Sequence, residues 1–249
     1  MGERGSRAAA QPQTVYKSLA RYYDLLYAWK DYRGEAQTVR RLIAKYKESP
    51  GNDLLEVACG TGKHCQFLKR DFNVLATDAN AGMLRVARRN VAGVAFRKAD
   101  MVTLDLGREF DAIVCLFSSI GYVGTPARLR RTIRNFARHL KTGGVVIIEP
   151  WFTKATYKAG RPSMTTFGDK DIKIARLSVC EVRGNVSVLD MNYLVAERDK
   201  AVKFYVDRHE LGMFEPAMFL AFMREAGLRA TVVKRGLMQD RGLYVGVKQ

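Results

Sequence analysis

The fold of this chain is decided by the stretch Glu56-Val57-Ala58-Cys59-Gly60-Thr61-Gly62, which joins the end of a short apolar run to the start of a helical segment. Its two glycines let the backbone turn tightly and approach a ligand with no side chain in the way. A dinucleotide-binding turn needs a third glycine three residues after Gly62, where this chain has Cys65. The stretch therefore indicates a ligand other than a nicotinamide dinucleotide, and the acidic Glu56 suits a ligand that carries a cationic amino group.

Strand and helix signals alternate along the chain on either side of this turn. Short apolar runs separated by helical segments imply a parallel sheet, because crossover connections place helices over both of its faces. We therefore predict a doubly wound, Rossmann-like α/β sheet, preceded by two helices at 16–29 and 35–47. The predicted strands are 53–58, 73–77, 94–96, 110–117 and 144–149, and the predicted helices between them are 63–69, 81–90 and 126–140.

The pattern changes after Pro150. Three β-rich segments follow, at 173–183, 185–196 and 203–211, and a turn at Gly184-Asn185 joins the first two, which predicts an antiparallel insertion. A helix near 216–226 and strands near 228–234 and 242–247 then complete the α/β part. We therefore expect a disordered tail at 1–13, an α/β domain made of 14–150 and 212–249, and a β-rich insertion at 151–211.

The charge of the chain is its most unusual compositional feature. A net charge of +17 over 249 residues favours an anionic partner through long-range attraction. Nucleic acid, a nucleotide-linked small molecule and an acidic lipid all satisfy that condition, and so does a basic surface kept for solubility. The arginines of the predicted helix 126–140 are expected to face solvent, with Leu129, Ile133 and Phe136 facing inward.

Several classes of protein and site are not favoured by the sequence. No apolar run approaches the ~20 residues of a membrane-spanning helix, and the first ten residues lack the apolar core of a signal peptide. We therefore expect a soluble, cytoplasmic protein without a membrane anchor. The four cysteines form no Cys-x-x-Cys pair and the three histidines have no ligand spacing, which predicts reduced thiols and no metal. His209 and Cys180, in the insertion, are interpreted as structural, and Tyr22, Tyr27 and Trp29 as core. His64, just after the glycine turn, either packs beside the ligand or caps the turn.

Two more acidic residues follow predicted strands. Asp78 ends the second strand, where a carboxylate can accept hydrogen bonds from both ribose hydroxyls of an adenosine. Asp100 and Met101 follow the third strand, where the carboxylate could accept from the exocyclic amine of adenine while Met101 covers the ring. Alternatively, Asp100 closes a loop or caps a helix.

Together these residues resemble the class I S-adenosylmethionine-dependent methyltransferases, many of which begin with an acidic residue followed by Cys-Gly-Thr-Gly. The resemblance implies S-adenosylmethionine as the cofactor. Glu56 would organise the amine of its methionine end, Ala58 and Gly60 would pass beneath it, and Asp78 would hold the ribose. The full cofactor-binding set implied in this way is Tyr23, Glu56, Ala58, Gly60, Gly62, Asp78, Asp100, Met101 and Leu116.

A narrower resemblance extends over nearly the whole chain after the tail. It links the chain to the amino-sugar N,N-dimethyltransferases, which methylate the amine of a nucleotide-linked deoxysugar. The segments that carry it are Tyr22-Tyr23-Asp24, Lys30-Asp31-Tyr32, Cys115-Leu116-Phe117-Ser118-Ser119-Ile120-Gly121-Tyr122, Glu149-Pro150-Trp151-Phe152, Tyr193-Leu194-Val195-Ala196 and Arg241-Gly242-Leu243-Tyr244. It implies an acceptor site formed by Tyr16, Glu149, Trp151, Ser178 and Arg241. It also implies that 14–150 and 212–249 form the S-adenosylmethionine-binding domain and that the insertion 151–211 binds the substrate.

Two positions bear on the substrate and the chemistry. Arg241 would meet the diphosphate, since a guanidinium pairs well with phosphate oxygens. The family commonly has His after Ser-Ser-Ile-Gly, where this chain has Tyr122. Orienting the amine against the methyl group can contribute ~7–11 kcal/mol, more than the ~3–5 kcal/mol typical of a general base. The amine must nevertheless lose its proton, and Tyr122 and Tyr32 are the catalytic candidates, with Glu149 or water as alternatives; Tyr122 could also simply wall the pocket.

Two other functions satisfy part of this evidence. The charge would suit a methyltransferase for tRNA or rRNA, but the fourth strand ends Phe117-Ser118-Ser119, without the Asn/Asp-Pro-Pro-aromatic or Pro-Cys signatures expected of such enzymes. A non-catalytic S-adenosylmethionine-binding protein would share the turn and lack turnover. An oligomer is possible, and the sequence does not decide it.

Overall fold

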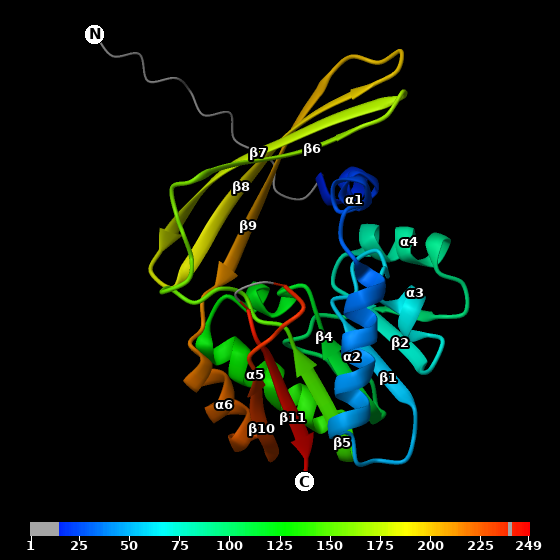
Figure 1. Ribbon diagram of the computed structural model, residues 1–249, viewed down its shortest axis with the longest axis vertical. Coiled ribbons are helices and arrows are strands. Elements are labelled where there is room, and N and C mark those ends of the chain that lie inside the picture. The colour runs from blue at the N-terminus through cyan, green and yellow to red at the C-terminus, as the bar shows by residue number, and fades with distance from the viewer. Residues whose placement is uncertain (1–14, 239–240) are drawn as a thin grey trace.

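The computed structural model describes residues 15–238 and 241–249, and side chains from Ala20 onward. Its elements form two sheets, one seven-stranded and one four-stranded (Figure 1). The predicted tail at 1–13 lies outside the described residues. Within the described part of the chain, no helix is both long and apolar enough to cross a membrane.

The larger sheet has a parallel core with one antiparallel strand. Its order is β10-β11-β5-β4-β1-β2-β3, and β11 runs antiparallel to both of its neighbours. Strand β1 pairs with β2 on one side and with β4 on the other. The order of the strands therefore reverses between β1 and β4, which is the switch point of the sheet. Ligands of such sheets bind at the switch point, beyond the carboxyl ends of the strands. The strands are β1 (Asp53–Val57), β2 (Asn73–Asp78), β3 (Ala95–Lys98), β4 (Phe110–Cys115), β5 (Leu140–Ile148), β10 (Leu228–Val233) and β11 (Leu243–Lys248).

Helices cover both faces of this sheet, which confirms the doubly wound fold. One buried cluster joins the sheet to α5 and α6, and a second joins it to α2, α3 and α4. Leu129, Ile133 and Phe136 of α5 are fully buried, as their spacing predicted. The helices are α1 (Val15–Leu26), α2 (Tyr32–Tyr46), α3 (Cys65–Leu68), α4 (Ala81–Asn90), α5 (Pro126–Arg138) and α6 (Pro216–Glu225), and a short 3-10 helix, η1, spans Ser119–Val123.

The smaller sheet is an antiparallel meander of four strands in the order β6-β7-β8-β9. It lies over the carboxyl ends of the parallel strands, and β9 packs against η1 (Figure 1). The prediction of three strands was wrong by one, because β6 is largely exposed and has no apolar alternation to reveal it. The turn predicted at Gly184 is present, with φ +61°. The strands are β6 (Pro162–Gly168), β7 (Ile172–Arg183), β8 (Val186–Glu197) and β9 (Lys203–Gly212).

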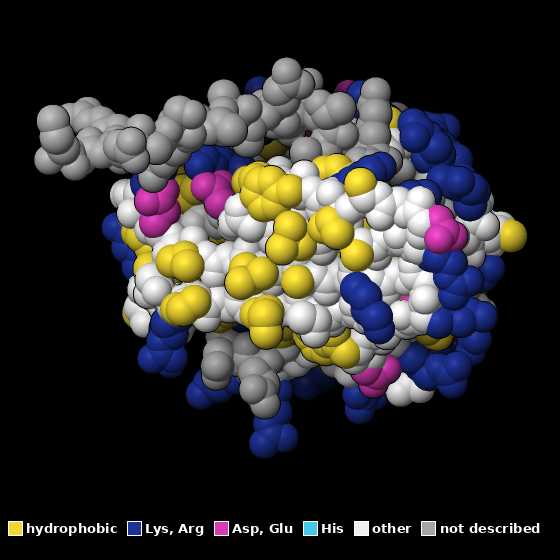
Figure 2. Space-filling model, turned by 90° about the horizontal axis from the view of Figure 1, so that it is seen from above, with side chains coloured by type: hydrophobic (Ala, Val, Ile, Leu, Met, Phe, Trp, Pro, Cys, Tyr) yellow, Lys and Arg dark blue, Asp and Glu magenta, His cyan; other side chains and the backbone are white. Residues whose placement is uncertain are grey.

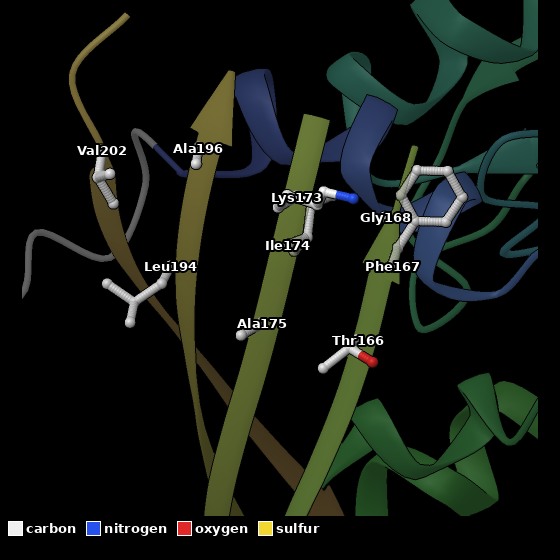
Figure 3. A pocket seen from close by; sticks show the side chains of 9 residues that line it. All are labelled: Thr166, Phe167, Gly168, Lys173, Ile174, Ala175, Leu194, Ala196 and Val202. Carbon is white, nitrogen blue, oxygen red and sulfur yellow. The ribbon is translucent and has the colours of Figure 1, made fainter. Parts of the chain in front are cut away.

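The two faces of this smaller sheet differ. Its inner face packs against α1, where Tyr22 and Leu26 meet Ile174, Tyr193 and Val195. Trp29, interpreted as core from the sequence, is instead 66% exposed because it follows the end of α1. The outer face carries apolar side chains in contact with solvent (Figure 2), and residues of β6, β7 and β8 with Val202 line a shallow hollow of about 430 Å³ on the sheet (Figure 3). The exposed apolar side chains of the sheet are Met164, Leu177, Val179, Val182, Leu194, Val202 and Phe204.

Candidate active site

The glycine turn after β1 has three residues with left-handed backbone. Ala58, Gly60 and Gly62 have φ values of +56°, +55° and +78°, a region that costs energy for any residue with a Cβ. A Cβ built on Gly62 would lie 3.3 Å from Val91, so this glycine permits tight packing. A Cβ built on Gly60 would meet nothing within 4 Å. The turn therefore presents bare backbone to open space at the switch point of the sheet.

Asp78, at the end of β2, holds this turn in place. Its Oδ2 accepts a hydrogen bond from the backbone N–H of Gly60 at 2.8 Å, and its Oδ1 accepts from the N–H of Asn80 at 2.7 Å. Burial raises the pKa of this carboxyl, while the two N–H donors act in the opposite direction. Helix α1 reaches the same turn, since the hydroxyl of Thr61 donates to Asp24 at 2.6 Å. The turn is thus fixed from two sides.

Glu56 belongs to a buried chain of charged groups that the sequence did not reveal. Its Oε2 accepts from Cys65 Sγ at 2.8 Å, and its Oε1 lies 3.8 Å from His64 Nδ1. His64 Nε2 contacts Glu35 at 2.7 Å, and Glu35 pairs with Lys30. Burial raises the pKa of Glu56, and His64 partly offsets that rise. Burial opposes ionisation of Glu35, but its bonds to His64 and Lys30 hold its pKa below the usual value.

The side chain of His64 belongs to this group of linked charged residues and does not cap the turn. His64 occupies the position before α3, yet its side chain makes no capping hydrogen bond and instead connects two carboxylates. Lys30 and Glu35 were not identified from the sequence. Glu35 and its partner His64 are 29 residues apart, and Lys30 and Glu35 lie on either side of the start of α2, so no short motif joins them. Four charged or ionisable side chains therefore converge behind the glycine turn.

The residues predicted for adenine lie beyond β3. Asp100 is about half exposed: its Oδ1 accepts from the N–H of Val102 at 2.9 Å, and its Oδ2 lies 3.8 Å from Arg128. The loop-closing alternative for Asp100 is thus present in the structure, with the second oxygen facing a cation. Met101 packs at the edge of the core, and Leu116 is buried directly after β4.

Aromatic residues from α1, α2 and η1 gather near the glycine turn. The rings of Tyr23 and Tyr27 lie 4.6 Å apart. Burial raises the pKa of Tyr23 well above its usual value, and the nearby phenols of Tyr27, Tyr32 and Tyr122 raise it further. Burial also raises the pKa of Tyr32, whose hydroxyl is buried and has no hydrogen-bond partner among the described residues. These phenols are therefore neutral donors around one site.

Glu149 lies at the end of β5, on the other side of the switch point. It is fully buried, and its Oε2 accepts from the N–H of Phe117 at 2.6 Å. Its Oε1 has no hydrogen-bond partner among the described residues. Burial raises the pKa of Glu149, Glu35 raises it further, and Lys30 acts in the opposite direction. An unpartnered buried carboxylate oxygen is costly, which suits a ligand that brings a cation or a donor.

Arg241 lies near Glu149 and beside the ring of Trp151. Its guanidinium carbon is 4.9 Å from the ring centroid of Trp151 and 4.2 Å from that of Phe152, and its Nη1 donates to Ser118 Oγ at 2.6 Å. Arg241 also acts on the charge of Glu149. The indole N–H of Trp151 donates to Ser187 on β8 at 2.8 Å, which ties this group to the smaller sheet.

The other predicted acceptor residues are less closely gathered. Ser178 is buried on β7 and exchanges a 2.8 Å hydrogen bond with Ser163, within the smaller sheet. Tyr16 belongs to α1, but its side chain lies outside the described residues. Over the described ranges, no three His, Cys, Asp or Glu side chains form a group that could hold a metal.

Comparison with known proteins identifies the class of this enzyme. The family described as "Methyltransferase domain" matches residues 54–144, which span the glycine turn, Asp78 and Asp100. The parallel sheet with its switch point at β1 and β4 is the fold of that class. The chain is an S-adenosylmethionine-dependent methyltransferase.

The closer relatives narrow this class. The chain is 35% identical to dTDP-3-amino-3,4,6-trideoxy-alpha-D-glucopyranose N,N-dimethyltransferase of Streptomyces venezuelae, over 90% of this chain and 95% of the relative. The crystal structure of Streptomyces venezuelae DesVI superposes with a TM-score of 0.86 at 34% identity, covering 92% and 98% of the two chains. CalS10, an amino pentose methyltransferase of Micromonospora echinaspora solved with S-adenosylmethionine bound, gives 0.80 at 28% identity, covering 99% and 100%. The chain belongs to the family of amino-sugar N,N-dimethyltransferases.

The residues at the carboxyl edge of the sheet fit this cofactor. The open space beside Gly60 leaves room for a ligand against the backbone. The buried Glu56 and the partly buried Asp78 would supply carboxylates for an amine and for ribose hydroxyls. The unpartnered hydroxyl of Tyr32 is a further donor at the same place. The two carboxylates, the tyrosine hydroxyl and the open space beside Gly60 are therefore compatible with a ligand that carries an amine and a ribose.

Proposed function

We propose that this protein methylates the amine of a nucleotide-linked amino sugar. The observation that carries the proposal is that Arg241 lies close enough to Glu149 to act on its charge, at one edge of the site. The guanidinium, fixed between two aromatic rings and Ser118, suits a diphosphate. The buried oxygen of Glu149, which has no hydrogen-bond partner among the described residues, suits an ammonium group. A substrate with an anionic end and a cationic end satisfies both.

The cofactor would lie on the other side of the switch point. We assign Glu56 to its amine, Ala58, Gly60 and Gly62 to the backbone beneath it, Asp78 to the ribose, and Asp100 with Met101 to the adenine; Tyr23 and Leu116 border it. When bound, it supplies a methyl carbon on a sulfonium, and the new N–C bond forms as the C–S bond breaks and its electron pair stays on sulfur. Asp78 acts here by holding both the turn and the ribose.

The protein contributes chiefly orientation and exclusion of water. Holding an amine at near-attack distance from a methyl carbon can lower the activation free energy by about 7–11 kcal/mol. The phenols of Tyr23 and Tyr32 would lie between the cofactor and the acceptor. Because burial raises their pKa values, these phenols stay neutral and form no ion pair with the amine of the acceptor. Glu149 and Arg241 set the direction in which the sugar enters.

The four-stranded sheet is proposed as the part that recognises the acceptor. We assign residues 151–211 to this insertion and the flanking segments 14–150 and 212–249 to the cofactor domain. Trp151 reaches the sheet through Ser187, and Ser178 lies on the inner face of β7. The sugar would therefore be held between the carboxyl ends of the parallel strands and the inner face of this sheet.

A methyl-transfer screen tests this proposal. Purified protein is incubated with S-adenosylmethionine labelled on its methyl group and, in parallel, with dTDP-linked 3-amino and 4-amino deoxysugars, the corresponding free amino sugars, simple phenols and tRNA. We expect label on the nitrogen of a nucleotide-linked amino sugar and none on RNA. Labelled RNA with unlabelled small molecules would overturn the proposal.

Arg241→Ala separates substrate recognition from chemistry. Loss of the diphosphate contact should raise KM for the nucleotide sugar by roughly 10- to 100-fold, with kcat within about 3-fold of the wild type. The matched control is Arg229→Ala, which removes an exposed arginine that pairs with Glu48 at the other end of the sheet. With a free amino sugar as the acceptor, Arg241→Ala and the wild type should have the same KM. An unchanged KM for the nucleotide sugar would remove Arg241 from the site.

A further inference from the structure

Tyr122 contacts His209 on β9 of the smaller sheet, and His209 in turn contacts Asp207. Its hydroxyl lies 2.6 Å from Nδ1 of His209, and the two rings are 5.9 Å apart. Nε2 of His209 lies 3.1 Å from Oδ2 of Asp207. Asp207 and His209 alternate along β9 and therefore share one face of the sheet, the face that meets η1. A carboxylate and an imidazole on β9 and a phenol on η1 thus lie next to one another in that order.

Burial decreases along this line. Asp207 is 8% exposed, the side chain of His209 is 12% exposed, and Tyr122 is 47% exposed. A carboxylate buried to this extent is costly unless it is paired, and its partner here is the imidazole. The phenol is at the open end, close enough to Tyr23 to influence its ionisation. The polar line therefore ends in the region where the phenols gather.

Other charged or titratable groups face this line from each neighbouring element. Tyr23 approaches Tyr122 from α1, and Tyr193 approaches Asp207 from β8. Arg176 on β7 lies next to Tyr193 and hydrogen-bonds Tyr27. Arg208, which lies between Asp207 and His209 in sequence, points to the opposite face and pairs with Asp190. The carboxylate of Asp207 lies 3.1 Å from the imidazole of His209.

We propose that Tyr122, His209 and Asp207 form a proton relay that deprotonates the ammonium group of the acceptor. This inference rests on the proposed function. The ammonium proton passes to the oxygen of Tyr122 while the phenol proton passes to Nδ1 of His209. The products are a neutral amine, a neutral phenol and an imidazolium whose Nε2–H faces Asp207. The amine then carries the lone pair that attacks the methyl carbon.

The relay removes the difficulty that a tyrosine poses as a base. A phenol in water has a pKa near ~10, so a lone phenolate is scarce at neutral pH. In the relay, no phenolate accumulates, because the phenol gives up one proton as it takes another. Many enzymes activate a reacting group in a similar way: a base contacts the reacting group, and a carboxylate orients the base. Tyr122 is the catalytic residue, and His209 and Asp207 are positioning residues.

The relay also accounts for repeated transfer to one nitrogen. Each transfer leaves the methylated nitrogen protonated, so a second methyl group requires a second deprotonation. Between turnovers the extra proton can return from Nδ1 of His209 to the oxygen of Tyr122, while the phenol, which is 47% exposed, releases its own proton to water. The same three residues therefore serve both steps.

Activity as a function of pH tests the relay. In Tyr122→Phe and His209→Gln, kcat at pH 7 should fall about 100-fold, with KM within about 3-fold of the wild type. Above the pKa of the free amino sugar the substrate enters already deprotonated, so the loss should shrink to less than about 5-fold. The control Arg208→Gln changes the neighbouring residue on the opposite face of β9 and should match the wild type at every pH. An equal loss at all pH values, or no loss, would overturn the relay.

A second measurement needs no turnover. The chain has only three histidines, so ¹⁵N-labelled histidine gives few imidazole signals to assign. The relay requires His209 to carry its proton on Nε2 and leave Nδ1 as the acceptor, and Asp207→Asn should reduce that preference. A proton on Nδ1 in the wild type would overturn the relay. If the wild type methylates an amino sugar and the relay variants match it at all pH values, the relay fails and the proposed function stands. If the wild type methylates none, the proposed function itself fails.

Discussion

The two sheets of this molecule are built in opposite ways. Every residue of β4 in the larger sheet is buried, because helices cover both of its faces. In the smaller sheet buried and exposed residues alternate, with Tyr193 and Val195 inward and Leu194 outward. The first arrangement holds backbone turns at a fixed edge, and the second presents polar side chains from one face. The proposed cofactor site therefore depends mainly on the geometry of the backbone. The proposed acceptor site depends on side chains that come together from both sheets.

The sequence separation of the contacts differs in the same way. The bond from Gly60 to Asp78 spans 18 residues and joins two consecutive strands. The contacts of Tyr122 with His209 and of Arg241 with Ser118 span 87 and 123 residues. Loop-closure entropy makes such distant contacts depend on the whole fold being formed. The acceptor side should therefore be the first part of the site to be lost when the two sheets are loosened.

The largest effect on stability is expected in the larger sheet. Ile113 is fully buried in the middle of β4, between β1 and β5. Ile113→Ala should lower the free energy of unfolding by about 2–5 kcal/mol, because the cavity has helices on both sides and cannot collapse. Denaturant unfolding measures this change. A loss below about 1 kcal/mol would contradict the view that this sheet is tightly packed on both faces.

An intermediate effect is expected at Glu149, between the two sheets. Burial raises the pKa of this carboxyl above that of the unfolded chain, so the folded state binds more protons, and stability falls as pH rises from the unfolded value through the folded one. Glu149→Gln keeps an acceptor for Phe117 N–H and removes this titration. The stability of the variant relative to the wild type should therefore increase as the pH rises above 4.5.

Thermal or denaturant unfolding at several pH values measures that difference. A relative stability that stays constant with pH, or that falls, would mean that Glu149 is stabilised as an anion by Lys30 and Arg241 more strongly than burial opposes it. The same variant should lose activity on the amino sugar, because the proposed partner of the ammonium group loses its charge.

The smallest effect is expected on the outer face of the smaller sheet. Phe204 on β9 is 60% exposed. Phe204→Ser should change the free energy of unfolding by less than about 0.5 kcal/mol, as do most surface substitutions. A loss as large as that of Ile113→Ala, measured under the same conditions, would show that this face is covered in solution and that the contrast between the sheets is smaller than the fold indicates.

The sequence predicted the larger sheet well because its signals are local. Apolar runs, the glycine turn and the acidic residues at or just after the ends of β1, β2, β3 and β5 lie within a few residues of one another, and the order of strands and helices followed from them. Strand β6 was missed because an exposed edge strand needs no apolar pattern. Trp29 was misplaced because aromatic character alone indicates burial, while its exposure follows from where α1 ends.

The site was predicted unevenly for the same reason. The positions of Gly60 and Asp78 around the turn follow from a short motif, and the structure brings them together. The Lys30–Glu35–His64 chain and the role of His209 beside Tyr122 could not be predicted, because their partners meet only when separate elements pack. His209 was interpreted as structural from its place in a strand, and its contact with Tyr122 is visible only in three dimensions.

Calorimetric titration of S-adenosylmethionine into the purified chain tests the central claim most directly, namely that the glycine turn held by Asp78 is the cofactor site. We expect the wild type to bind the cofactor and Asp78→Ala to bind it roughly 100-fold more weakly. Asp71→Ala, which removes an exposed carboxylate paired with Arg40, should bind as the wild type does. No binding by the folded wild type, or equal binding by a folded Asp78→Ala variant, would contradict the account.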